Sequence, residues 1–149
     1  MINKRSNFIK FLGTAGARFV MIKQLRATGG IWISYKGTNL LIDPGPGSIV
    51  RCAIAKPKLD PSELEGIILT HKHLDHANDI NVMIKGMTEG GFKKRGVVFC
   101  PADAINQDSI ILKYARSFPA KIEILKARRR YKVGSVSFET SMRHLHTAE

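Results

Sequence analysis

The residues best suited to chemistry lie in the segment 70–76, which reads THKHLDH. Three imidazoles and one carboxylate occur close together there, at His71, His73, Asp75 and His76. Buried neutral rings would each need a polar partner, and protonated rings so close together would repel one another. A metal ion removes both difficulties, because neutral imidazole and carboxylate are preferred ligands of zinc and related metals. The segment therefore predicts a metal site.

The spacing of these residues suggests how metals are shared. In an extended segment, residues i and i+2 point the same way, so His71 and His73 are expected to bind a first metal. Asp75 and His76 lie beyond the bend into a following helix and are expected to face a second metal. Two ions about 3.5–4 Å apart can hold a water molecule and lower its pKa to roughly 7. We predict that Asp75 also orients this attacking water.

The elements around the segment explain how it is positioned. Residues 66–70 (GIILT) are a continuous apolar run, typical of a strand buried on both faces. Residues 77–87 place apolar side chains at helical spacing and predict a helix. Further strands are predicted at 8–12, 31–35, 39–42, 96–100, 121–125 and 133–142. Residues 31–35 and 39–42 are expected to form a hairpin about a tight turn, and Val136 and Phe138 alternate with Ser137 and Glu139. Further helices are predicted at 48–56, capped by Ser48, and at 107–118, with Tyr114 inward. This order predicts an α/β (α+β) fold with a mixed sheet and helices packed on it.

Three segments together resemble a known family. HKHLDH at 71–76 resembles the HxHxDH motif of the metallo-β-lactamase superfamily, and FLGTAGAR at 11–18 resembles the opening strand and turn of its ribonuclease Z-like members. NLLIDPGPG at 39–47 resembles the superfamily's aspartate-bearing loop. The resemblance implies that Asp43 lies beside the metals and supports their ligands without binding directly. It implies one or two Zn²⁺ ions as cofactor, although Mn²⁺ and Fe²⁺ also suit such ligands.

The resemblance also implies a third histidine for the first metal at the end of a later strand. The segment RHLHTAE at 143–149 offers His144 and His146. We favour His146, because HTAE resembles the start of the stretch that follows this ligand in the family. The alternative is a surface histidine near the chain end.

The resemblance covers the N-terminal half of the family's αββα sandwich. We therefore expect residues 1–149 to form a single, C-terminally truncated domain, without the bridging aspartate and final histidine that the second half supplies. Ile67, Leu69, Val97 and Phe99 are expected to leave one face of the sheet uncovered, which favours a homodimer or a separate C-terminal half. Ribonuclease Z-like members commonly carry a glycine shortly after the motif, and its absence from residues 77–79 weighs against tRNA processing.

Composition restricts the partners. The net charge of +12 favours anionic substrates, small molecules or nucleic acid, and basic residues cluster at 4–5, 93–95 and 126–132. Tyr131 in the last cluster could stack on a base, and the alternative is a solvated surface. No apolar run is long enough for a membrane span, and no signal peptide is recognisable, so a cytoplasmic location is expected. Cys52 and Cys100 are expected to be reduced, partly buried thiols.

Two functions remain open. The first is a metal-dependent hydrolase acting on a phosphodiester, ester or thioester. The second is a catalytically incomplete fragment that binds metal, or nucleic acid through its basic clusters.

Overall fold

A computed structural model of the chain describes residues 6–144. The strands are β1 (Phe8–Phe11), β2 (Ile31–Tyr35), β3 (Thr38–Ile42), β4 (Gly66–Ile68), β5 (Val97–Cys100), β6 (Lys121–Ile124), β7 (Arg130–Val133) and β8 (Val136–Glu139). The α-helices are α1 (Arg18–Ile22), α2 (Ser48–Ile54), α3 (Leu74–Ala77) and α4 (Ile80–Met87), and short 3₁₀ turns are η1 (Pro61–Glu63), η2 (Glu89–Gly91), η3 (Ala102–Ala104) and η4 (Lys113–Ser117).

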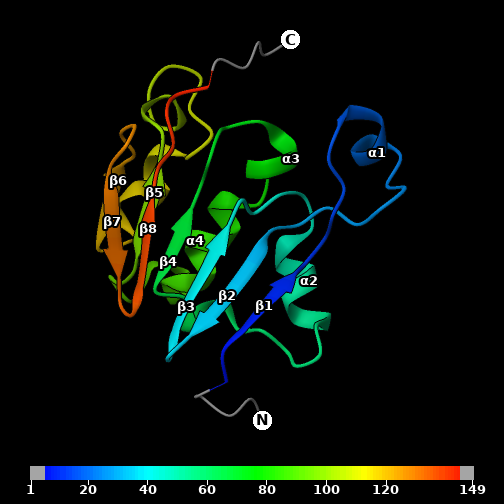
Figure 1. Cartoon of the computed structure of the whole chain (residues 1–149), viewed down its shortest axis with the longest axis horizontal. Coiled ribbons are helices and arrows are strands. Elements are labelled where there is room, and N and C mark those ends of the chain that lie inside the picture. The colour runs from blue at the N-terminus through cyan, green and yellow to red at the C-terminus, as the bar shows by residue number, and fades with distance from the viewer. Residues whose placement is uncertain (1–5, 145–149) are drawn as a thin grey trace.

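The first six strands form one sheet in the order β1-β2-β3-β4-β5-β6 (Figure 1). β1, β2 and β3 pair antiparallel, and the predicted hairpin between β2 and β3 is confirmed. β3 to β6 pair parallel, because each is connected to the next through helices or 3₁₀ turns. The predicted mixed sheet is therefore confirmed, and the carboxyl ends of four parallel strands lie along one edge.

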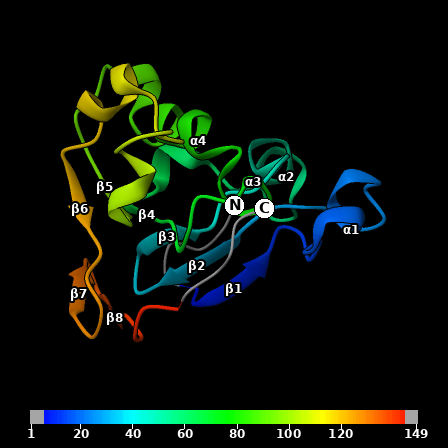
Figure 2. The same ribbon diagram turned by 90° about the horizontal axis from the view of Figure 1, so that it is seen from above.

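One face of the sheet carries the main core. Helices α2 and α4 lie on this face (Figure 2). Alternate side chains of the strands, including Trp32, Leu41 and Ile67, pack against them. The helical spacing predicted for residues 77–87 is confirmed in α4, where the apolar stripe is fully buried: Ile80, Met83, Ile84 and Met87.

The opposite face is covered over part of its width. β7 and β8 form a separate two-stranded sheet, and the Phe138 ring lies 5.1 Å from the Phe99 ring, edge to face. The expectation that Phe99 leaves a face uncovered is wrong, because this hairpin buries it to 3% exposure. Ile67 and Leu69 belong to the helix-covered core and are fully buried, so they too are not uncovered.

The uncovered apolar surface lies elsewhere, on β1 and β2. Ile9 and Phe11 are 61% and 62% exposed, and Tyr35 is exposed as well. A cavity of about 460 Å³ lies between these strands and the start of β8, and it is lined by residues 7–9, 33–35 and 135–137.

The single strand predicted at 133–142 is wrong in its bounds. Residues 134–135 form a turn, β8 covers only Val136–Glu139, and β7 lies almost entirely before the predicted range. Gly134 takes φ 53, and Ser135 N donates a hydrogen bond to Thr38 Oγ1, which attaches the turn to the main sheet. Val136 and Phe138 do alternate inward as predicted.

The helix predicted at 107–118 is also wrong. The Asn81 side chain donates to Ile110 O and accepts from Leu112 N, so these backbone groups bond across the fold and not within a helix. Only the 3₁₀ turn η4 forms, and Tyr114, predicted to point inward, is 57% exposed.

The helix predicted at 77–87 is interrupted, and the interruption matters for the site. α3 and α4 are separated at residues 78–79, where Asp79 N donates to Pro44 O and Asp79 Oδ2 accepts from Ile49 N. Gly47 occupies the cap position of α2, and the predicted cap, Ser48, is its first helical residue. These contacts fasten the loop 43–47 and the start of α2 to the end of α3.

The lengths of the helices and the burial of the two thiols bear on two smaller expectations. No helix in the part of the chain that the structure describes is both long and apolar enough to cross a membrane. Cys52 and Cys100 are unbonded and buried, as expected, and burial raises the pKa of each thiol to about 11.

Candidate metal centre

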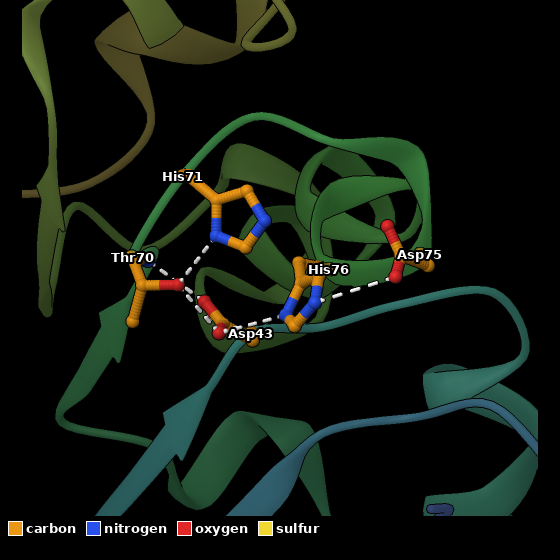
Figure 3. A network of polar contacts seen from close by, with 5 residues as sticks. All are labelled: Asp43, Thr70, His71, Asp75 and His76. Carbon is orange, nitrogen blue, oxygen red and sulfur yellow. Dashed lines mark hydrogen bonds and ion pairs between the residues drawn. The ribbon is translucent and has the colours of Figure 1, made fainter. Parts of the chain in front are cut away.

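The candidate residues gather at the carboxyl edge of the parallel strands. Asp43 follows β3 and Thr70 follows β4, and the register pairs Ile42 with Ile68, so the two strands end side by side. His71 follows Thr70, and α3 then carries Asp75 and His76 back over this edge (Figure 3). This is the position at which open α/β sheets place their sites.

Asp43 is held in an unusual backbone conformation. Its φ is 50°, in the left-handed region that few residues other than glycine adopt. The Asp43 N–H donates to Ile68 O at 2.8 Å, and the Gly45 N–H donates to Asp43 O at 2.8 Å, so both sides of the residue are fixed. Such strain persists where the surrounding structure requires it, and here it aims the carboxylate at the site.

The Asp43 carboxylate accepts three hydrogen bonds. Its Oδ1 accepts from Thr70 N at 2.7 Å, and its Oδ2 accepts from the Thr70 hydroxyl at 2.7 Å and from His76 Nδ1 at 3.0 Å. The side chain thus joins the end of β4 to α3 (Figure 3). This geometry is compatible with the supporting role that the sequence resemblance implied for Asp43, and that role stays a prediction.

The bond to Asp43 sets the tautomer of His76. A carboxylate can only accept, so His76 Nδ1 carries the proton and the lone pair lies on Nε2. His76 Nε2 lies 3.4 Å from Asp75 Oδ2. A nitrogen lone pair and a carboxylate oxygen therefore lie next to each other, as two ligands of one metal would.

Thr70 performs the same task for His71. Its hydroxyl proton goes to Asp43, so its oxygen accepts from His71 Nδ1 at 2.9 Å, and the lone pair of this ring also lies on Nε2. In the sequence, Thr70 has no feature beyond its place at the end of a predicted strand. The signal that was missed is its place directly before the first histidine, within reach of the aspartate of the neighbouring strand.

The two histidines have opposite pKa shifts. Burial, followed by the charge of His76, lowers the pKa of His71, which favours the neutral ring that a metal needs. The hydrogen bond to Asp43 raises the pKa of His76 by stabilising its protonated form.

The donor set fits a metal ion. One ligand atom from each of Asp43, His71 and His76 lies within 4.8 Å of the others. The ring centroids of His71 and His73 lie 4.9 Å apart, and those of His71 and His76 lie 4.2 Å apart. The structure thus brings the four motif residues and Asp43 together, while their assignment to a first or second metal stays a prediction.

The two candidates for the third histidine of the first metal lie near the C-terminal end of the chain. His144 is exposed beyond the end of β8. His146 lies outside the described residues, so the preference for it also stays a prediction.

Glycine at position 45 lets the aspartate loop approach α3. A Cβ built on Gly45 would lie 2.1 Å from the Asp75 carbonyl oxygen and 3.2 Å from Thr28 Cγ2. Ser48 Oγ donates to the Gly45 carbonyl at 2.8 Å. The close backbone contact sets the separation between Asp43 and His76, because the two residues lie on the opposing segments.

Comparisons with known proteins agree with this geometry. The sequence profile of the Beta-lactamase superfamily domain matches residues 38–148. The chain is 32% identical over 121 residues to the uncharacterized protein MJ1374 of Methanocaldococcus jannaschii, covering 78% of this chain and 45% of that protein. It is 38% identical over 77 residues to ribonuclease Z of Thermococcus kodakarensis, covering 52% of this chain and 23% of the enzyme. The chain thus spans less than half the length of these relatives.

Solved structures show the same fold. The metallo-beta-lactamase fold protein YhfI of Bacillus subtilis matches with a TM-score of 0.56 at 22% identity, over 72% of this chain and 42% of that one. A putative metallo-beta-lactamase of Thermotoga maritima matches with a TM-score of 0.53 at 20% identity, over 83% and 60%. Taken together, the matched profile, the fold and the histidine-rich edge of the sheet establish that this chain belongs to the metallo-β-lactamase superfamily.

Proposed function

We propose that this chain carries the principal metal-binding part of a metal-dependent hydrolase. The observation that supports it best is the network in which Asp43 and Thr70 orient His76 and His71. Hydrogen bonds of this kind fix the ring tautomers of metal ligands and raise their affinity for the metal. A purely structural histidine cluster would have little use for a strained aspartate that sets two tautomers.

In this proposal His71 and His73 hold a first metal together with His146. Asp75 and His76 hold a second, and Zn²⁺, Mn²⁺ and Fe²⁺ all suit these ligands. Metal ions in such a site polarise the substrate and supply an activated water at neutral pH. Asp75 accepts a hydrogen bond from the attacking water and orients it, and Asp43 keeps the proton on His76 Nδ1.

The substrate that we favour contains a phosphodiester, with a carboxylic ester or thioester as the alternative. Relatives named ribonuclease Z support the phosphodiester, as does the net charge of +12. A match to a structure described as a diphosphatase of the PhnP family, with a TM-score of 0.57 at 15% identity, supports the fold alone.

We further propose that a C-terminal half, in the same polypeptide or as a separate chain, completes the site and covers the exposed face of β1 and β2. The exposed Ile9 and Phe11 favour a covering partner, and the alignment to 45% of the M. jannaschii protein supports this choice over a second copy. A dimer of this chain in sedimentation equilibrium would favour the second copy.

The metal content of the purified protein tests the site. We expect the variant with His71→Ala and His73→Ala to lose most of the zinc bound by the wild type, and His146→Ala to weaken binding. His144→Ala serves as the control and should retain wild-type zinc. Equal zinc in the wild type and the double variant would reject the site. Metal binding without hydrolysis of bis(p-nitrophenyl) phosphate, even with the second half present, would favour the non-catalytic alternative.

A further inference from the structure

The connection between β6 and β7 presents a concentrated positive charge. Residues 126–129, which we call the basic loop, include Lys126, Arg128 and Arg129, all exposed. Arg130, at the start of β7, is already in an ion pair with Glu139 at 3.5 Å. Lys126 and Arg129 have no acidic partner among residues 6–144. Their charges therefore face solvent and are open to an anionic ligand.

The basic loop lies at the same edge of the sheet as the candidate metal centre (Figure 1). It follows the carboxyl end of β6, which is parallel to β4 and separated from it only by β5. Neighbouring strands lie about 4.8 Å apart, so the base of the loop lies roughly 10 Å along the edge from the end of β4. A bound polyanionic chain that spans a few phosphates would reach both the basic loop and the candidate metal centre.

The loop is held in place before any ligand binds. Thr140 Oγ1 donates to Lys126 O and accepts from Arg129 N, and Arg128 N donates to Ser141 O at 3.2 Å. Lys126 N donates to the Tyr131 hydroxyl at 2.8 Å. A fixed backbone lowers the entropy lost when the side chains engage a ligand.

The structure gives the tyrosine of this cluster a packing role. Tyr131, predicted to stack on a base, stacks on Phe138 with ring centroids 5.5 Å apart and also contacts Phe99. Its hydroxyl is held by the basic loop, and its ring belongs to the core beneath the hairpin. Recognition at this surface would therefore depend on phosphates and not on bases.

We propose that the basic loop binds backbone phosphates of a single-stranded nucleic acid. The loop would hold this nucleic acid across the edge of the sheet that carries the candidate metal centre. This rests on the proposed phosphodiester hydrolysis, because it names the substrate class of the same site. Three separate cations on one loop suit a chain of phosphates better than one phosphate group, and the Tyr131 ring is already engaged in packing on Phe138. Binding should be independent of base sequence and strongly dependent on salt.

The test uses the full chain and a fluorescent 12-nucleotide oligouridylate, with binding measured by anisotropy from 0.05 to 0.3 M salt. The variant combines Lys126→Ala with Arg129→Ala. The matched control combines Lys58→Ala with Lys94→Ala, which are exposed and precede β4 and β5 at the opposite edge. Each phosphate contact contributes about 0.7 to the slope of log K against log salt. The variant should lower the slope by about 1.4 and weaken binding about 25-fold at 0.1 M salt, while the control changes little.

Each other result overturns the proposal. An unchanged slope, or equal weakening by the control, would show that the basic loop is not the binding surface. Lost binding to vesicles containing anionic phospholipid, with oligouridylate binding retained, would assign the loop to a membrane surface. The variant with Lys126→Ala and Arg129→Ala should bind as much zinc as the wild type, because these residues lie outside the candidate metal centre. Failure of the proposed metal site therefore remains distinguishable from failure of phosphate binding.

Discussion

Substitution of Gly45 by alanine offers a sharp test of how the site is assembled. The added Cβ would lie 2.1 Å from the Asp75 carbonyl oxygen, whereas real contacts of this kind begin near 3.0 Å. The aspartate loop and α3 must therefore separate by about 0.9 Å. Because Asp43 and His76 lie on these two segments, their 3.0 Å hydrogen bond would stretch to roughly 4 Å, beyond hydrogen-bonding distance.

Two effects are expected from this separation. Overpacking of a close backbone contact costs about 1–3 kcal/mol of unfolding free energy, which urea denaturation measures. Loss of the partner of a metal-binding histidine weakens metal affinity about 10–100-fold, which zinc titration against a chromophoric chelator measures.

Gly16→Ala is the matched control. A Cβ there meets nothing within 4 Å, and the φ of Gly16, like that of Gly45, lies outside the left-handed region. The control should keep both stability and zinc affinity. If Gly45→Ala lost stability but bound zinc as tightly as the wild type, the reasoning that links the loop spacing to the His76 ligand would be refuted.

Two further predictions concern the hydrogen bonds of Asp43 and the packing beneath the β7–β8 hairpin. Asp43→Asn should lower the pKa of His76 in the metal-free protein, because the hydrogen-bonded carboxylate that raises it becomes neutral; an unchanged NMR titration of His76 would contradict this. Phe99→Ala should reduce the unfolding free energy by about 3–5 kcal/mol, since Phe99 is 3% exposed beneath the β7–β8 hairpin. Phe92→Ala, at a residue 94% exposed, should stay within about 0.5 kcal/mol, and similar losses for both would show that the hairpin does not cover the sheet.

The sequence by itself determined the parts of this protein that depend on local pattern. The stripe of α4 follows from apolar residues at helical spacing, and the β2–β3 hairpin follows from two short strands around a tight turn. The four motif residues could be identified as a cluster because they are adjacent in the chain. Periodicity and proximity in sequence are sufficient for such features.

The tertiary structure alone decided the features that depend on contacts across the fold. Asn81 satisfies the backbone of residues 110 and 112 and prevents the predicted helix, and Thr38 holds the turn at which the last predicted strand begins late. The hydrogen bonds that Asp43 accepts from Thr70 and His76 span 27 and 33 positions. No local pattern encodes which polar groups meet at such separations, because the meeting depends on strand order and register. The orientation of the metal ligands is therefore a product of the folded sheet, although their identities can be read from the sequence.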